Sequence, residues 1–272
     1  MILGLLVRYG TKRYPQGTED GIRAFRAFAG RREHELVVLD NAIAPDTRRS
    51  LGPGVQLEGA DNTVREFTAW DRALGERLDA LRPDDVVVLI TDALRQADAD
   101  HLDEIAGDAA DLVAEWPAAY GRLDAFPEPI VVRGLPLSGW LRSSFVAMSA
   151  HVLRTVLPLA EIRPADLFHS PDDPLSFKDS VVPPGYEAIL TDWLQGNELV
   201  GGARYHAGKV IEQRSVGDFQ VKASCVVNEH LLSARLVARG IRLVDLEWWR
   251  HSEVSVNREL ADLGEQLAWR GR

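Results

Sequence analysis

The chain has 272 residues, of which 46% are hydrophobic and 26% are charged, a balance typical of a globular protein with a sizeable core. Its formal net charge of -10 argues against non-specific binding to nucleic acid, which requires a basic face. The one cysteine, Cys225, excludes a disulfide within the chain and a cysteine-rich zinc site, and it suits a reducing compartment such as the cytoplasm.

Strand and helix patterns alternate along the first half of the chain. Residues 2–7 form an apolar run without the features of a signal peptide, so we expect a first buried strand there. Similar runs predict strands at 35–40, 85–91 and 129–133, and helical patterns predict helices at 18–30, 63–81, 102–116 and 145–157. This alternation favours an α/β fold with a mostly parallel sheet and helices on both faces.

The second half of the chain is less regular. Residues 160–184 are rich in Pro and Asp and therefore favour loops, while helices are expected at 186–194, 220–239 and 256–269 and a strand at 241–246. No apolar run reaches the ~18 residues needed to span a membrane. With no linker to divide the chain, residues 1–272 are expected to form one domain with a helical C-terminal part.

Polar residues follow three of the predicted strands. Arg8-Tyr9, Asp40-Asn41 and Thr91-Asp92 stand at these strand ends. In an open parallel sheet, ligands bind outside the carboxyl ends of the strands, and these side chains could hold phosphate, base, ribose or metal. The alternative is that they start loops, where Asp, Asn and Thr bond the local backbone.

A second group of candidates surrounds the start of the predicted helix at 63–81. Asn62 and Arg65 lie at its N-terminus, which favours anions, and Asp71 lies one residue off the apolar stripe. Thr63 and Glu66 have the spacing of a capping box, so we expect Glu66 to be a cap rather than a catalyst.

The order of these elements resembles the family 2-type GT-A glycosyltransferases of bacterial surface-polysaccharide assembly. The resemblance rests on the strand followed by Asp40-Asn41, on Asn62 with Arg65-Glu66-Phe67-x-x-Trp70-Asp71, and on the strand ending at Asp92. It implies a GT-A-like domain in which residues 1–133 bind a nucleotide-sugar and residues 134–272 form the acceptor side. The donor-binding candidates are Arg8, Tyr9, Asp40, Asn41, Asn62, Arg65, Asp71, Thr91 and Asp92.

The family also has a DxD-like element that touches the donor ribose and a divalent metal. Here Ile90-Thr91-Asp92 retains one acid. Either Mg²⁺ or Mn²⁺ is held by Asp92 together with the donor diphosphate and water, or the reaction is metal-independent.

Two later stretches resemble acceptor-side segments of the same family. In 139–149, Trp140 offers a ring face for a sugar and Arg142 a charge for phosphate or hydroxyl, although Trp140 could equally be core. In 222–233, Lys222, Cys225 and Glu229 lie near one face of a helix, where Glu229 could be a base or a structural carboxylate.

Inverting transfer of a hexosyl or deoxyhexosyl group needs a general base, which in this family is usually an Asp or Glu beyond the fourth strand. Asp172 and Asp173 are candidates, and Asp179 beside Lys178 is favoured because a cation keeps a carboxylate ionised. The set of catalytic candidates is Asp179, Glu187 and Glu229.

The function expected from the resemblance is transfer of a sugar from a nucleotide-sugar donor to a polysaccharide, glycolipid or other glycan. Expected partners are that donor and acceptor, with no nucleic acid, in the cytoplasm and with peripheral contact at the inner face of the cell membrane left open. The missing second acid supports an alternative, a non-catalytic relative that binds nucleotide or serves assembly. Sequence motifs of α/β-hydrolases, Walker A proteins, dinucleotide oxidoreductases and zinc hydrolases are absent.

Overall fold

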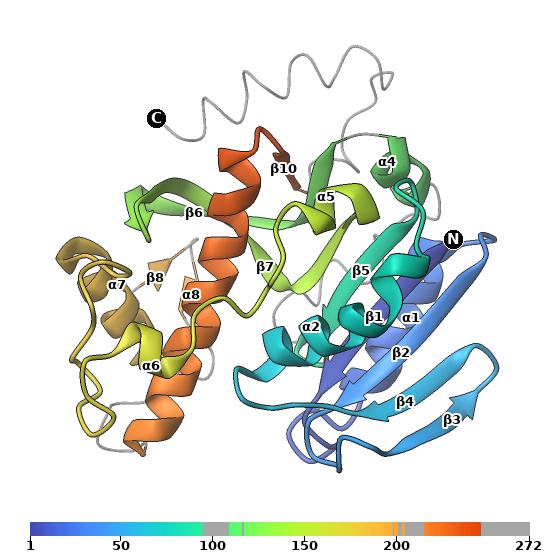
Figure 1. Cartoon of the computed structure of the whole chain (residues 1–272), viewed down its shortest axis with the longest axis horizontal. Helices are drawn as coiled ribbons and strands as arrows, with labels where there is room; N and C mark the ends of the chain where they lie inside the picture. The colour runs from blue at the N-terminus through green and yellow to red at the C-terminus, as the bar shows by residue number, and fades with distance from the viewer. Residues whose placement is uncertain (95–108, 116, 198, 201–202, 205–214, 246–272) are drawn as a thin grey trace.

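The computed structural model of the protein has an eight-stranded mixed sheet at its centre (Figure 1). The structure describes residues 1–94, 109–115, 117–197, 199–200, 203–204 and 215–245. The strand order is β10-β6-β7-β5-β1-β2-β4-β3. These strands are β1 (Ile2–Arg8), β2 (His34–Asp40), β3 (Arg48–Gly52), β4 (Val55–Gly59), β5 (Val86–Thr91), β6 (Ala118–Val132), β7 (Leu135–Ser149) and β10 (Arg242–Asp245).

The α/β class is confirmed, but the expectation of a mostly parallel sheet is wrong. Strands β4, β2, β1 and β5 run parallel, as do β6 and β10. Strand β7 is antiparallel to both of its neighbours, β5 and β6, and β3 is antiparallel to β4. The sheet is therefore mixed, with β7 inserted between strands of the opposite direction.

The helix expected at 145–157 is strand in its first part and helix only from Ala150 to Arg154. Residues 145–149 are the buried end of β7, and the short helix α5 (Ala150–Arg154) begins only after Ser149, whose hydroxyl accepts a hydrogen bond from Val152 N at 3.3 Å. A run that is apolar on both faces suits a strand in the middle of a sheet. The predicted strand at 129–133 is likewise only the end of the 15-residue strand β6.

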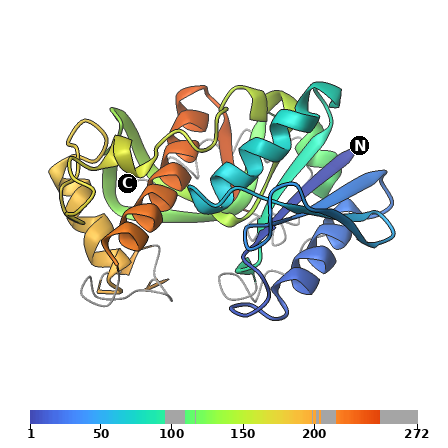
Figure 2. The same ribbon diagram turned by 60° about the horizontal axis from the view of Figure 1, so that its bottom comes forward.

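Helices cover both faces of the sheet, as expected. On one face lie α1 (Gly17–Ala29) and α4 (Ala109–Glu115), whose side chains share a core with β1 and β2. On the other lie α2 (Arg65–Arg77), with the short 3-10 helix η1 (Leu78–Ala80) at its end, and α5, together with part of α8 (Val216–Ala238). Figure 2 shows α1 and α2 on opposite sides of the strands.

A third core lies where the β6–β7 hairpin extends past β5. Helices α6 (Pro164–Leu167), α7 (Pro184–Leu194) and the first half of α8 pack there around Phe126, Trp140 and Tyr186. Because α8 contributes side chains both to this core and to the core under α2, most of its surface is buried.

Helices α7 and α8 and strand β10 confirm the helices predicted at 186–194 and 220–239 and the strand predicted at 241–246.

Some expected elements fall outside the described part of the chain. The helix expected at 102–116 is described only from Ala109 to Glu115, and the helix expected at 256–269 lies outside the described residues. A short two-stranded sheet, β8 (Leu199–Val200) and β9 (Ala203–Arg204), precedes α8. Within the described residues, no helix combines the length and the apolar character that crossing a bilayer would require.

Candidate functional site

The carboxyl ends of β1, β2 and β5 meet at one edge of the sheet, as the sequence predicts. Arg8 pairs with Asp40 in the register of β1 and β2, and Val7 pairs with Thr91 in the register of β1 and β5. The backbone N–H of Asp92 donates to the carbonyl oxygen of Val7 at 2.9 Å, which brings Asp92 beside the end of β1.

At this edge, Arg8 and Asp40 form a buried ion pair. The Arg8 Nε donates to Asp40 Oδ2 at 2.8 Å, while Asp40 Oδ1 accepts from the backbone N–H groups of Gly10 at 3.0 Å and Ala42 at 2.9 Å. Asp40 is only 2% exposed. The Asp40 carboxylate thus holds the loops that follow β1 and β2, and its expected contact with a donor stays a prediction that its burial does not favour.

Asp92 has a different environment at the end of β5. Its side chain is partly exposed, and its Oδ2 accepts a hydrogen bond from Tyr9 N at 3.3 Å. Burial raises the pKa of Asp92 to about 6, helped by the charge of Glu66 and opposed by the Tyr9 N–H and by Arg13 and Arg8. A carboxyl group with such a pKa, at the edge where open sheets bind ligands, is a functional candidate.

The start of α1 packs directly on Asp92. A Cβ atom placed on Gly17 would lie 2.2 Å from the carbonyl oxygen of Asp92, so only glycine fits at this point. Tyr9, which follows β1, is 60% exposed, and its backbone N–H donates to Asp92. The sheet edge thus combines an exposed tyrosine with a perturbed carboxyl group that bonds the tyrosine's backbone.

Glu66 is not the helix cap that its spacing predicts. Helix α2 starts at Arg65 without a side-chain cap, and the Thr63 hydroxyl donates to Asp61 Oδ1 at 2.6 Å instead of accepting from the helix. Glu66 Oε1 accepts a hydrogen bond from the Cys225 thiol at 2.9 Å, which joins α2 to α8. The two helices pack side by side in Figures 1 and 2.

Glu229 lies on α8, one turn after Cys225, and contacts a bulge in β7. The β6–β7 register changes from Gly121–Val146 to Leu123–Leu141, so β7 has extra residues there. Within this bulge, the backbone N–H of Ser143 donates to Glu229 Oε1 at 2.5 Å. Helix α8 therefore satisfies a backbone donor that the sheet ladder leaves unpaired.

Burial also raises the pKa of Glu229, to about 7, although the side chain is partly exposed. The Ser143 hydrogen bonds and the charge of Lys222 lower this pKa, while the charge of Glu66 raises it. Glu66 therefore acts on both Asp92 and Glu229. We call Glu66, Asp92 and Glu229 the carboxylate site.

Three other donor candidates lie near the same edge but have protein partners. Asn41 Nδ2 donates to Asn62 Oδ1 at 3.1 Å, joining the loops after β2 and β4. Arg65 Nη2 donates to Asp218 Oδ1 at 2.9 Å, joining the first turns of α2 and α8. They connect the parts of the chain that surround the carboxylate site.

Asp71, Trp140 and Arg142, the other donor and acceptor candidates, already have partners or packing within the fold. Asp71 accepts from Leu159 N at 2.7 Å and Ala160 N at 2.8 Å, and burial raises its pKa. Trp140 is 1% exposed, and the centroids of its ring and the Phe126 ring are 4.4 Å apart, so it offers no ring face to a sugar.

Arg142 is bound to Asp124, a buried residue, through Nε and through Nη2 at 3.1 Å. The expected donor role of Asp71 and the acceptor role of Arg142 stay predictions, and each side chain already has a partner in the fold. The expected acceptor role of Trp140 lacks an exposed ring.

The acids of the 172–187 segment lie in another part of the molecule. In Figure 1, α7, which carries Glu187, lies on the far side of α8 from β1 and β5. Asp172, Asp173 and Asp179 are exposed, and Lys178 donates to the carbonyl oxygen of Ala165 at 2.7 Å rather than pairing with Asp179. Among the catalytic candidates, Glu229 is therefore the one beside the sheet edge.

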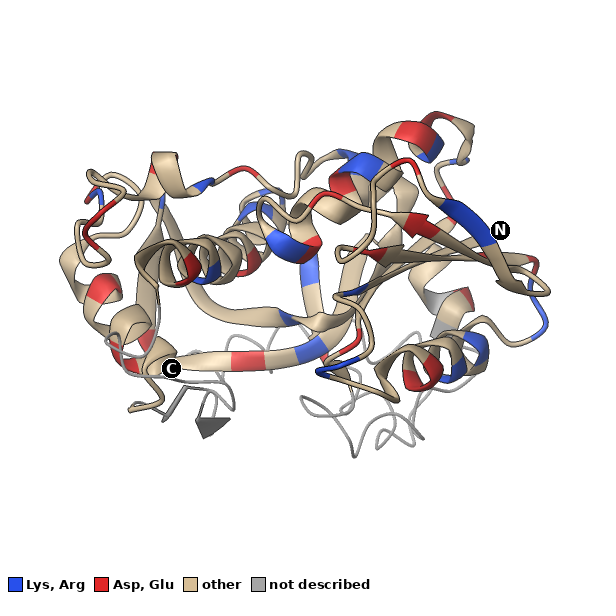
Figure 3. Ribbon diagram, turned by 90° about the horizontal axis from the view of Figure 1, so that it is seen from below, with Lys and Arg blue, Asp and Glu red and all other residues tan. Residues whose placement is uncertain are grey.

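Sequence reasoning missed two contributors to the site. Glu66 was interpreted as a helix cap because its spacing from Thr63 fits a capping box. Arg13, whose charge acts on Asp92, stands in a loop without a recognisable motif. The described residues contain no group of three or more His, Cys, Asp or Glu arranged to hold a metal. Over the described residues, Lys and Arg are interspersed with Asp and Glu (Figure 3).

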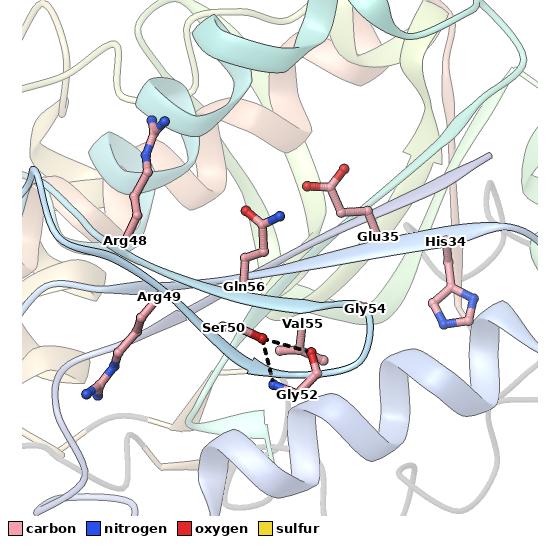
Figure 4. A pocket seen from close by; sticks show the side chains of 9 residues that line it. All are labelled: His34, Glu35, Arg48, Arg49, Ser50, Gly52, Gly54, Val55 and Gln56. Atoms are coloured by element: carbon pink, nitrogen blue, oxygen red, sulfur yellow. Dashed lines mark hydrogen bonds between the residues drawn. The ribbon is translucent and has the colours of Figure 1, made fainter.

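A shallow groove lies at the amino ends of β2 and β4, away from the carboxylate site (Figure 4). Its lining includes His34, Glu35 and the β3–β4 turn, with a volume of about 400 Å³. Arg48 and Arg49 point to opposite sides of β3, and Ser50 is bonded to Gly52 within the turn. These side chains do not converge on a common ligand.

No family model, no curated protein and no solved structure matches the chain.

Proposed function

We propose that the chain is a GT-A-type glycosyltransferase that moves a sugar from a nucleotide-sugar donor to a glycan or glycolipid acceptor. The observation that carries this proposal is the carboxylate site, where Asp92 and Glu229 have pKa values of about 6 and about 7. Perturbed carboxyl groups at the carboxyl edge of a sheet support an acid–base role for them. The parallel strands β4, β2, β1 and β5, extended by the antiparallel strand β7, also suit a GT-A-like architecture.

The donor nucleotide would lie over the ends of β1 and β5. The exposed Tyr9 ring can stack on the base, and the charge of Arg13 beside Asp92 can attract the diphosphate. Asp92 would accept hydrogen bonds from the ribose, most strongly in its ionised form, which dominates above a pH of about 6.

The described residues at this edge could hold a divalent cation only together with ligands from the donor and from water. With no group of three protein ligands in the described part of the chain, Mg²⁺ or Mn²⁺ at Asp92 would take further oxygen ligands from the diphosphate and water. Such an ion would neutralise charge on the leaving diphosphate.

We assign the general base to Glu229 rather than to Asp179 or Glu187. The ionised Glu229 takes the proton of the acceptor hydroxyl. The oxygen of that hydroxyl bonds to the anomeric carbon of the donor, and the bond from that carbon to the diphosphate breaks. The Ser143 N–H holds Glu229 Oε1 in place. A base with a pKa near the working pH is effective because it is largely ionised yet still binds a proton well.

A two-part experiment tests the proposal. Calorimetry with UDP, GDP, CDP and dTDP, with and without Mg²⁺, should show binding of one nucleotide, and Asp92→Ala should abolish sugar transfer while the fold remains intact. Full activity of Asp92→Ala would refute the role given to Asp92. Nucleotide binding without transfer to any acceptor would favour the non-catalytic alternative, and binding of none of the four nucleotides would contradict both.

A further inference from the structure

Glu66 and Glu229 come from different helices but are linked through Cys225. The Cys225 thiol donates to Glu66 Oε1 at 2.9 Å, and Cys225 and Glu229 are four residues apart on α8, so they share a face of that helix. Burial raises the pKa of the Cys225 thiol well above its ordinary value, so the thiol remains protonated and available as a donor. This bond holds the Glu66 carboxylate against the face of α8 that carries Glu229.

Groups from three elements act on Glu229. Lys222 comes from α8, Ser143 with its N–H and hydroxyl comes from the β7 bulge, and Glu66 comes from α2. The next residue on α8, His230, is neutral at physiological pH because burial lowers its pKa to about 3, and its Nδ1 lies 2.5 Å from the Tyr186 hydroxyl. Among the groups that act on Glu229, Glu66 is a carboxylate and thus opposes its ionisation.

We propose that Glu66 is a positioning residue for the acid–base chemistry of the carboxylate site, held by Cys225 against the face of α8 that carries Glu229, where its negative charge opposes the loss of the Glu229 proton. The catalytic consequence rests on the proposed function, whereas the effect on Glu229 itself does not. An ionised Glu66 favours the protonated form of Glu229, which makes Glu229 a stronger base once it is ionised.

The direct test is a titration of the Glu229 carboxyl carbon by ¹³C NMR in the full chain without substrate. In Glu66→Gln, which keeps the shape of the side chain but removes its charge, the Glu229 midpoint should fall by about half a pH unit. The matched control is Glu76→Gln on the same helix, where Glu76 pairs with Arg48 and Arg77, and it should leave the midpoint unchanged.

A folded Glu66→Gln variant with an unchanged Glu229 midpoint would overturn the proposal, as would an equal shift in Glu76→Gln. Should Glu66→Gln fail to fold, Cys225→Ala and Cys225→Ser decide. Cys225→Ala removes the donor that holds Glu66 and should lower the midpoint, while Cys225→Ser retains a donor and should preserve it. Equal midpoints in these two variants would also contradict the proposal.

A second measurement separates this inference from the proposed function. If the chain transfers sugar, the acidic limb of its pH–rate profile should move to lower pH in Glu66→Gln by the same amount as the NMR midpoint. A shifted midpoint in a protein that transfers no sugar would leave the Glu66–Glu229 coupling standing and refute only the enzymatic role.

Discussion

The two ends of β5 each carry an aspartate, and their environments are opposite. At the amino end, Asp85 is 3% exposed and accepts from the Met1 ammonium at 2.6 Å, from Arg82 N at 2.7 Å and from Arg82 Nη2 at 3.2 Å. Burial by itself would raise the pKa of Asp85, but these bonds outweigh it and lower the pKa. At the carboxyl end, burial raises the pKa of Asp92 to about 6, since the Tyr9 N–H and the charges of Arg13 and Arg8 do not offset it.

This contrast separates an acid that the fold satisfies from one that it leaves perturbed. A buried carboxylate with enough partners stabilises the fold, and the same is true of Asp40 and Asp124, each paired with an arginine. A carboxylate left partly unsatisfied destabilises the folded state when ionised, and proteins retain such groups where a ligand uses them. Under the proposed function, Asp92 at the carboxyl end of β5 is of the second kind.

The largest effect expected at the functional end is on transfer itself. Glu229→Gln keeps an acceptor for the Ser143 N–H but cannot take a proton, so the turnover rate should fall by about 10²–10⁴-fold. Glu187→Gln on α7 is the control and should retain full turnover. Turnover of a donor found by the calorimetric screen measures both, and normal activity of Glu229→Gln would remove Glu229 from the reaction.

At the structural end, Asp85→Asn should reduce the free energy of unfolding by about 1.5–3 kcal/mol, because it weakens the charge-assisted hydrogen bonds of a buried carboxylate to the partly exposed Met1 and the exposed Arg82. The folded pKa of Asp85 lies below its ordinary value of 3.8, so this stabilisation is present above pH 3.8 and is lost as the pH falls through the folded pKa. Urea denaturation at pH 7 and at pH 3 measures it. An unfolding free energy equal to wild type at pH 7 would contradict the structural role.

The packing of α1 on Asp92 can be broken with a single methyl group. Gly17→Ala would place Cβ 2.2 Å from the Asp92 carbonyl oxygen, so we expect a loss of about 1–3 kcal/mol in the free energy of unfolding and weaker nucleotide binding. Gly75→Ala is the control, because a Cβ there meets nothing within 4 Å, and it should stabilise α2 slightly. Thermal denaturation and calorimetry compare the two variants.

The smallest effect is expected for Asp92→Asn, and its sign is opposite to that of Asp85→Asn. The folded pKa of Asp92, about 6, exceeds its ordinary value of 3.8, so the folded state binds more protons than the unfolded state between these values. Stability therefore falls as the pH rises through this window, and Asp92→Asn should raise the free energy of unfolding above pH 6 by about 1 kcal/mol. Denaturation at pH 8 measures it, and a destabilised Asp92→Asn would show that Asp92 is structural too.

Periodicity predicted much of the fold. The continuous apolar runs of β1, β2 and β5 and the amphipathic face of α2 are local patterns, and they predict buried parallel strands and covering helices. The failure at 145–157 has a physical reason as well, because a short run that is apolar throughout fits a central strand and a buried helix equally. Only the pairing of β7 with β5 and β6 distinguishes the two.

The candidate site was predicted in outline only. Strand ends carry Asp40 and Asp92 alike, and in the sequence the two look equivalent. Whether the fold satisfies a carboxylate depends on hydrogen-bond donors from other segments of the chain, such as Arg8 for Asp40. The same holds for Glu66, whose partner Cys225 is 159 residues away.

The class of the fold, the meeting of three strand ends at one edge and the positions of acids along that edge could be predicted from the sequence. All three follow from periodicity and from the direction of parallel strands. Only the tertiary structure decided which acids are satisfied and which are perturbed. The pKa of a carboxyl group depends on burial and on charges and hydrogen bonds from distant segments, and the packing of α8 against α2 and the β7 bulge supplies these for Glu229.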